Sequence, residues 1–138
     1  MPFFIGVDGG GSKTAFALSY ANGIPIVQTE SIGCSYQSVG LERAADIIAD
    51  GIKKCSTQAG EPLKNCAYCC IGVPCWGENA ECDTALYELL KQKLPGVPIK
   101  AVNDVEVAWA GAQECQSGIH IVAGTGSITY GVAPDGKT

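Results

Sequence analysis

The chain has 138 residues, a length suited to one domain with its own hydrophobic core. Hydrophobic residues make up 46% of it and its mean hydropathy is +0.15, values typical of a compact protein rather than a disordered one. The formal net charge is −5 and the lysines are scattered, which argues against the basic face that a nucleic-acid partner needs. A phosphate ligand stays compatible with this acidity, because backbone N–H groups and Mg²⁺ can hold one.

Membrane insertion and secretion are not expected. The sequence lacks an apolar run of about 18 residues, roughly the shortest that crosses a bilayer. Its beginning, MPFFIGVDGGG, lacks the basic segment and the long apolar stretch of a signal peptide. We therefore expect a cytoplasmic protein with no membrane partner.

In chain order, the first three segments are predicted to be strands. Phe3–Val7 is a compact apolar run, and Thr14–Tyr20 alternates large with small residues. Ile24–Thr29 follows the turn signal ANG. The chain is therefore expected to open with three antiparallel strands, with a glycine loop inside the first hairpin.

The rest of the chain alternates between helices and strands. Ser31–Gly40 is predicted to be a loop, and Leu41–Gln58 has the apolar spacing of a helix that ends before Gly60 and Pro62. The following elements are strand Cys66–Val73, helix Asp83–Leu94, strand Ile99–Asn103, helix Asp104–Cys115, and strands Ile119–Ala123 and Ser127–Val132. The order β-β-β-α-β-α-β-α predicts an α/β fold with a mixed sheet and helices on its faces.

The cysteines do not indicate secretion. Cys66 and Cys69 form a C-x-x-C on a predicted strand, where residues three apart point to opposite faces and do not share an ion. We expect the cysteines to be free and to fill apolar space, with an iron–sulfur or zinc role shared with a partner as the alternative. They are Cys34, Cys55, Cys66, Cys69, Cys70, Cys75, Cys82 and Cys115.

The first glycine loop, DGGGSKT, follows the first strand. A P-loop needs a helix after it, as does a dinucleotide-binding loop, and here a strand follows. A tight turn between strands can instead direct the N–H groups of Gly9–Gly11 into one concavity, with Ser12, Lys13 and Thr14 in reach of phosphate oxygens. Asp8 could then hold Mg²⁺ through water. A glycine-rich hairpin without any ligand is the alternative.

Two later segments strengthen the phosphate interpretation. In VNDVEVAWAGA, Asp104 ends a predicted parallel strand, where open α/β sheets place their sites. Its carboxylate could accept a proton from an attacking hydroxyl, or it could simply cap a helix. In IVAGTGSITYG, a second glycine turn offers N–H groups and the hydroxyls of Thr125 and Ser127.

These three motifs together resemble the BadF/BadG/BcrA/BcrD ATPase family, which includes N-acetylglucosamine kinases and belongs to the actin–hexokinase–Hsp70 superfamily. The resemblance implies a ribonuclease H-like domain over residues 1–118. Residues 119–138 would form the opening hairpin of a second domain, whose later Gly-Asp-Glu-Gly-Ser-like motif and adenosine site are not found in this sequence. We therefore expect the N-terminal half of a longer protein, inactive by itself in phosphoryl transfer, with the C-terminal domain as a partner.

The resemblance also implies roles for single residues. The cofactors would be ATP and Mg²⁺, the substrate a sugar or amino sugar, and Asp104 the catalytic base toward the sugar hydroxyl. Asp8 would lie on the metal side. Phosphate binding would fall to Gly9, Gly10, Gly11, Ser12, Lys13, Thr14, Gly124, Thr125 and Gly126, and sugar binding to Ser35, Asn103, Asp104 and Ser127.

One residue departs from the family pattern. Sugar kinases of this family usually carry an asparagine in the loop after the third strand, where this chain has Ser35. A serine does not supply both an amide donor and an acceptor, so the identity of the sugar stays open. The alternatives are the ATPase activator of a 2-hydroxyacyl-CoA dehydratase, which uses an iron–sulfur cluster, and a non-catalytic ATP-binding module. A homodimer through the two trailing strands is a further expectation.

Overall fold

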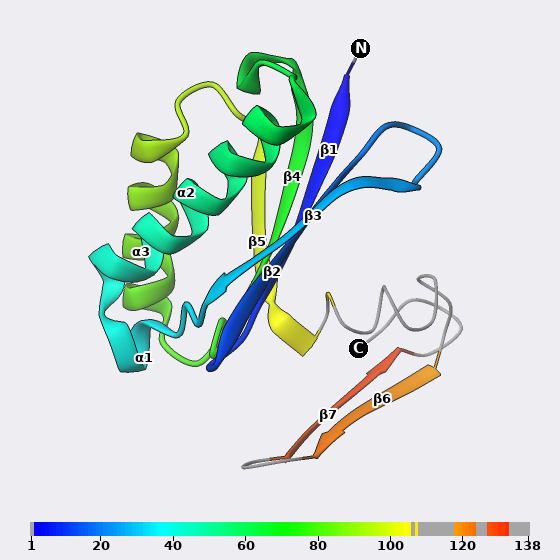
Figure 1. Cartoon of the computed structure of the whole chain (residues 1–138). Coiled ribbons are helices and arrows are strands. Elements are labelled where there is room, and N and C mark those ends of the chain that lie inside the picture. The colour runs from blue at the N-terminus through cyan, green and yellow to red at the C-terminus, as the bar shows by residue number, and fades with distance from the viewer. Residues whose placement is uncertain (1, 106, 108–117, 124–126, 133–138) are drawn as a thin grey trace.

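The computed structural model of the chain describes residues 2–105 and 107, together with the backbone of residues 118–123 and 127–132. Five strands form the main sheet: β1 (Phe3–Gly9), β2 (Lys13–Ser19), β3 (Pro25–Ile32), β4 (Cys66–Val73) and β5 (Ile99–Asn103). Their order across the sheet is β3-β2-β1-β4-β5. β1, β2 and β3 pair antiparallel, whereas β4 lies parallel to both β1 and β5 (Figure 1).

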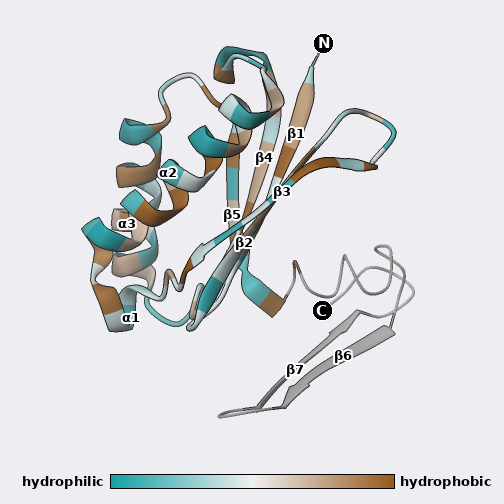
Figure 2. Cartoon of the chain, viewed as in Figure 1, coloured by the Kyte–Doolittle hydropathy of each residue, from teal (hydrophilic) through white to brown (hydrophobic). Residues whose placement is uncertain are grey.

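Two helices cover one face of this sheet. α2 (Leu41–Ala59) and α3 (Ala80–Lys93) lie on the same side of it in Figure 1. The core lies between them and the sheet, because the buried residues of β1 alternate with exposed ones. Apolar residues are concentrated along β1, while both helices mix hydrophilic and hydrophobic residues (Figure 2).

The predicted loop Ser31–Gly40 is partly wrong. β3 continues through Ile32, because its pairing with β2 runs as far as Lys13. The short helix α1 (Tyr36–Val39) follows, and its buried Tyr36 anchors it to the core. A single turn of helix has too few residues to show an apolar period, so the sequence pattern does not reveal it.

The other element predictions that fall on described residues are confirmed, with shifted ends. α3 begins at Ala80 rather than Asp83, because the side chain of Asn79 accepts a hydrogen bond from the Cys82 N–H at 3.1 Å and caps the helix. A short 3₁₀ helix, η1 (Leu63–Asn65), precedes β4. Of the predicted helix 104–115, residues 104, 105 and 107 are helical, and the remainder lies outside the described residues.

The predicted orientation of the C-x-x-C pair is wrong. The pairing of β1 with β4 shifts register after Phe3, which faces Cys66, so that Phe4 faces Tyr68. This bulge reverses the alternation of side chains, and both Cys66 and Cys69 are buried in the core. Burial raises the pKa of both thiols, which suits neutral packing residues.

The last described strands form a sheet of their own. β6 (Gly118–Ala123) and β7 (Ser127–Val132) pair antiparallel, which confirms the predicted hairpin of two strands. Within the described part of the chain, no helix is both long enough and apolar enough to cross a bilayer.

Candidate functional site

The first glycine loop and Asp104 share one pocket at the edge of the sheet. β1, β4 and β5 are parallel, so their carboxyl ends lie at the same edge. A pocket of about 360 Å³ opens there between the loop after β1 and the residues after β5. It is lined by Asp8, Gly9, Gly10, Gly11, Ser12, Lys13, Ala15, Asp104 and Val105.

The glycine loop is supported from below by the residues that follow β3. The Cys34 N–H donates to the Gly10 carbonyl oxygen at 3.0 Å. Gly33 approaches the loop so closely that a Cβ there would overlap the carbonyl oxygen of Gly11. Cys34 is fully buried beneath Gly9, and burial raises the pKa of its thiol. These contacts constrain the backbone of the loop at Gly9, Gly10 and Gly11.

Thr14 supports the loop from inside the protein rather than facing the pocket. Its side chain is 0% exposed, and its hydroxyl donates to the Ile32 carbonyl oxygen at 2.9 Å. The alternation along β2 places Thr14 on the buried face together with Phe16 and Leu18. The same period of two is visible in the sequence, so it could have indicated that this hydroxyl does not reach a phosphate.

Lys13 is the cation of this pocket. Its side chain is exposed and its Nζ lies 3.6 Å from the Glu30 carboxylate. An exposed ion pair of this kind contributes little free energy, so Lys13 can exchange Glu30 for an anionic ligand.

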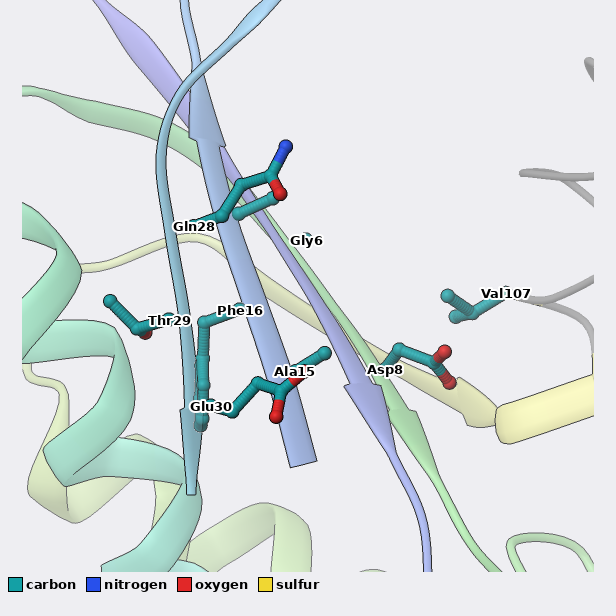
Figure 3. A pocket seen from close by; sticks show the side chains of 9 residues that line it. Gly6, Asp8, Ala15, Phe16, Gln28, Thr29, Glu30 and Val107 are labelled. Carbon is teal, nitrogen blue, oxygen red and sulfur yellow. The ribbon is translucent and has the colours of Figure 1, made fainter. Parts of the chain in front are cut away.

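Asp8 lies at the boundary between this pocket and the face of the sheet that points away from α2. Its carboxylate points away from α2, toward the side on which Val107 lies (Figure 3). It also lines a second pocket of about 530 Å³, whose floor includes the small residues Gly6, Ala15 and Ala17. Desolvation raises the pKa of Asp8, and the positive charge of Lys13 partly offsets this.

Asp104 begins the helical segment after β5. Burial is the main cause that raises the pKa of its carboxyl, and the negative charges of Asp8 and Glu78 raise it further. The hydrogen bond from the Val105 N–H acts in the opposite direction. A carboxylate with a raised pKa binds a proton more strongly, which is what a general base must do.

Asp8 and Asp104 bring two carboxylates to the lining of one pocket. Both carboxylates line the same pocket, and their repulsion raises the pKa of Asp104. A divalent cation near them would relieve that repulsion, and carboxylate oxygens are the ligands that Mg²⁺ prefers. Among the described residues, no group of three His, Cys, Asp or Glu side chains could hold a metal ion by itself.

The two remaining residues that were predicted to bind a sugar are engaged within the protein. Asn103 donates from Nδ2 to the Trp76 carbonyl oxygen at 2.8 Å, and its Oδ1 accepts from the Val105 N–H at 2.9 Å. Ser35 is buried, and its hydroxyl hydrogen-bonds the Cys75 thiol. Asn103 thus holds in place the residues on either side of Asp104 and the carbonyl of Trp76.

The sequence patterns did not indicate a role in the site for the turn Cys75–Gly77. They also gave none to Gly33 and Cys34, which lie beneath the first glycine loop. Gly33, which follows β3, is recognisable in the sequence as a turn residue. The sequence does not show that it contacts the loop after β1. Of the second glycine turn, Gly124, Thr125 and Gly126 lie outside the described residues, and only the backbone of Ser127 is described, at the start of β7.

Solved structures share this architecture. A protein assigned as an N-acetylglucosamine kinase from Chromobacterium violaceum superposes with a TM-score of 0.75 and is 27% identical; the match covers 98% of this chain and 46% of that one. The inorganic polyphosphate/ATP-glucomannokinase of Arthrobacter sp. strain KM superposes with a TM-score of 0.67 at 20% identity, covering 96% and 58%. The predicted ribonuclease H-like fold is thereby confirmed.

Two curated proteins are similar in sequence. The N-acetylmuramic acid/N-acetylglucosamine kinase of Clostridium acetobutylicum is 31% identical over 139 residues, a match that covers 100% of this chain and 45% of that protein. The N-acetyl-D-glucosamine kinase of Dictyostelium discoideum is 32% identical, with 96% of this chain and 44% of that protein covered. The chain thus spans a little under half the length of the curated relatives it matches.

The sequence pattern of one protein family covers the glycine loop, the strand ends and the trailing hairpin together. It is the pattern of the BadF/BadG/BcrA/BcrD ATPases, and it matches residues 5–138. Because this match extends over nearly the whole chain, the chain belongs to the BadF/BadG/BcrA/BcrD ATPase family.

Proposed function

We propose that this chain forms the N-terminal part of an ATP-dependent kinase that phosphorylates a hydroxyl of an amino sugar such as N-acetylglucosamine. The observation that carries the proposal is the single pocket in which the glycine loop faces Asp104. Transfer of a phosphoryl group to a bound hydroxyl requires the phosphate site and the base to lie in the same pocket. The names of the two curated relatives support the choice of sugar.

The proposed roles follow from the position of each residue. The N–H groups of Gly9–Gly11 and the side chains of Ser12 and Lys13 bind the phosphates of ATP. Asp104 accepts the proton of the sugar hydroxyl as its oxygen attacks the γ-phosphorus, and the bond to the ADP oxygen breaks. Mg²⁺, held on the side of Asp8, would neutralise charge on the transferring phosphoryl group.

The second wall of the nucleotide cleft belongs to the same proposal. β6 and β7 form a sheet separate from the main one, and we assign them to the start of a second domain from residue 119 onward, after a first domain that ends at about residue 118. The turn 124–126 would then be the second phosphate loop, with Ser127 near the sugar. Because the 138 residues span under half of the curated relatives, we expect them to transfer little phosphate alone.

Neither alternative function is favoured by an observation. Both curated relatives are named as amino-sugar kinases, and none is named as a dehydratase activator. The cysteines nearest to each other along the chain, Cys66, Cys69 and Cys70, lie on β4, and the first two are core residues. We therefore retain the kinase as the single proposal.

The change Asp104→Asn tests the proposed base. In the protein expressed from its complete reading frame, we expect kcat for N-acetylglucosamine phosphorylation to fall by about 10²–10⁴, since the amide does not accept the proton. ATP affinity, measured by calorimetry, should stay within about threefold, because the glycine loop is untouched. Asp50→Asn, an exposed carboxylate on α2, is the control and should leave both values unchanged. An Asp104→Asn enzyme with near-normal kcat would reduce Asp104 to a helix cap.

A further inference from the structure

The turn Cys75–Gly77, which follows β4, has an unusual backbone conformation. Cys75 has φ of +68°, and among the described residues it is the one non-glycine residue in the left-handed region. Gly77 also has a positive φ, of +97°. A left-handed conformation is unfavourable for a residue with a Cβ, and it persists only where the surrounding structure enforces it.

Asp83 and Tyr36 enforce this conformation from the helix side. The Gly77 N–H donates to Oδ2 of Asp83 at 2.8 Å. The Tyr36 hydroxyl lies 3.3 Å from both Oδ1 of Asp83 and the Cys75 carbonyl oxygen, so it can donate to either one. Burial and the Asp83 charge raise the pKa of Tyr36 to about 12, which keeps this hydroxyl protonated. Two helices, α1 and α3, thus hold the same turn (Figure 1).

Asn103 holds the turn from the sheet side. Its Nδ2 donates to the Trp76 carbonyl oxygen at 2.8 Å, at the end of β5. Side chains from α1, β5 and α3 thus lie within hydrogen-bonding distance of the backbone of Cys75, Trp76 and Gly77, respectively. Two local backbone hydrogen bonds also stabilise the turn, from the Trp76 N–H to the Val73 carbonyl oxygen at 3.2 Å and from the Glu78 N–H to the Cys75 carbonyl oxygen at 3.1 Å.

Asp83 is a buried carboxylate in the first turn of α3, where its charge also favours the helix N-terminus. Its side chain is 8% exposed, and a buried carboxylate is unfavourable unless hydrogen bonds compensate for its lost water. Its Oδ1 accepts from the Tyr36 hydroxyl, and its Oδ2 accepts from the Gly77 N–H of the turn. A carboxylate at this position therefore serves the shape of the turn.

The turn lies beside the residues that follow β5, because Asn103 donates to the Trp76 carbonyl oxygen. The Cys75 thiol hydrogen-bonds with Ser35 and Glu78, and the charge of Asp104 acts on it. Glu78, at the end of the turn, acts on Asp104 in the same way. Asn103, which holds the turn, is the immediate neighbour of Asp104 along the chain.

We propose that Asp83 and Asn103 are positioning residues for acceptor recognition: by fixing the Cys75–Gly77 turn beside Asp104, they determine how well the sugar binds, while the glycine loop binds the nucleotide. This inference rests on the proposed kinase function. It assigns to Asn103 a structural contact with the turn in place of a direct contact with the sugar.

The kinetic test compares three variants of the protein expressed from its complete reading frame. Asp83→Ala should raise KM for N-acetylglucosamine about tenfold or more and change KM for ATP by less than about twofold. Asp83→Asn keeps an oxygen that accepts from Gly77, so it should restore KM for the sugar to within about threefold. Leu89→Ala weakens the packing of the same helix away from the turn, and it should leave both KM values unchanged.

Tyr36→Phe provides a milder change should Asp83→Ala not fold. It removes the hydroxyl between Asp83 and Cys75 and keeps the ring in the core. We expect the KM for the sugar alone to rise, by about threefold or more. Unchanged acceptor KM in a folded Tyr36→Phe enzyme would count against the proposal as directly as the same result for Asp83→Ala.

Alkylation supplies a readout other than activity. Cys75 and Cys82 are both partly exposed, and Cys82 lies on α3 outside the turn. Treatment with iodoacetamide followed by peptide mass spectrometry should show that saturating N-acetylglucosamine slows modification of Cys75 and leaves Cys82 unchanged. In Asp83→Ala, Cys75 should react faster and lose this protection.

The outcomes separate the two proposals. An active wild-type enzyme in which Asp83→Ala leaves the acceptor KM unchanged and the sugar does not protect Cys75 overturns the positioning role alone. A wild-type enzyme that phosphorylates no sugar overturns the proposed function and this inference together.

Discussion

Gly33 lies against the glycine loop so closely that no side chain fits between them. A Cβ at this position would overlap Gly11 and approach the carbonyl oxygen of Gly10, both of them backbone groups that do not rotate away. The neighbouring hydrogen bond from Cys34 to Gly10 fixes the distance between the two segments. The shape of the phosphate loop thus depends on a residue outside the loop.

The change Gly33→Ala should therefore weaken nucleotide binding. We expect KM for ATP to rise about tenfold or more, because displacing the loop by a fraction of an ångström misaligns several N–H groups at once. Steady-state kinetics with ATP varied would measure this. Gly6→Ala, on β1, is the control, since a Cβ there meets no atom within 4 Å. Equal KM values for both variants would show that the loop tolerates displacement.

At the scale of elements, α2 packs on β2 through a glycine. A Cβ at Gly51 would overlap the aromatic ring of Phe16, which is itself buried. The helix thus lies closer to the sheet than any larger residue would allow. Glycine is unfavourable within a helix by about 1 kcal/mol relative to alanine, so its presence here reflects the packing and not the helix.

The change Gly51→Ala sets helix propensity against packing. We expect the free energy of unfolding to fall by about 1–2 kcal/mol, because overpacking a buried contact outweighs the gain in propensity. Urea denaturation followed by circular dichroism would measure it. Asp50→Ala, at an exposed neighbouring position, should change the value by less than about 0.5 kcal/mol. A Gly51→Ala protein more stable than wild type would mean that α2 shifts freely on the sheet.

For the whole molecule, the charge around the site is negative. The negative charges of Asp8 and Glu78 act on Asp104 there, and the exposed Lys13 is paired with Glu30. The net charge of −5 adds to this field. Under the proposed function, the phosphates of ATP would bind together with Mg²⁺, whereas an anionic sugar would meet uncompensated carboxylates.

A neutral acceptor should therefore be preferred to an anionic one. We expect kcat/KM for N-acetylglucosamine to exceed that for N-acetylmuramic acid, which carries an additional carboxylate, by about tenfold or more. Competition kinetics at low and high ionic strength would measure the ratio, which should shrink as salt screens the repulsion. Equal efficiency at low salt would show that cations elsewhere in the protein dominate the field at the acceptor.

Much of the fold follows from local patterns in the sequence. The period of two in Thr14–Tyr20 and the helical spacing of Leu41–Gln58 predict their elements, because an element must bury its apolar residues on one side. The glycine loop and Asp104 were predicted as site residues because strand ends and glycine turns expose backbone N–H groups at one sheet edge. The structure brings these two motifs into one pocket.

Tertiary packing decides what these local patterns leave open. The register shift in β4 places Cys66 and Cys69 on one face, which depends on pairing with β1 and not on β4 itself. The contacts of Asn103 depend likewise on a turn that is distant in the chain. By itself the sequence determined the elements, the family motifs and the acidic charge, since these depend on neighbours along the chain. Only the tertiary structure decided which side chains face the pocket and which support it, because that choice depends on strand register and on contacts between residues far apart in sequence.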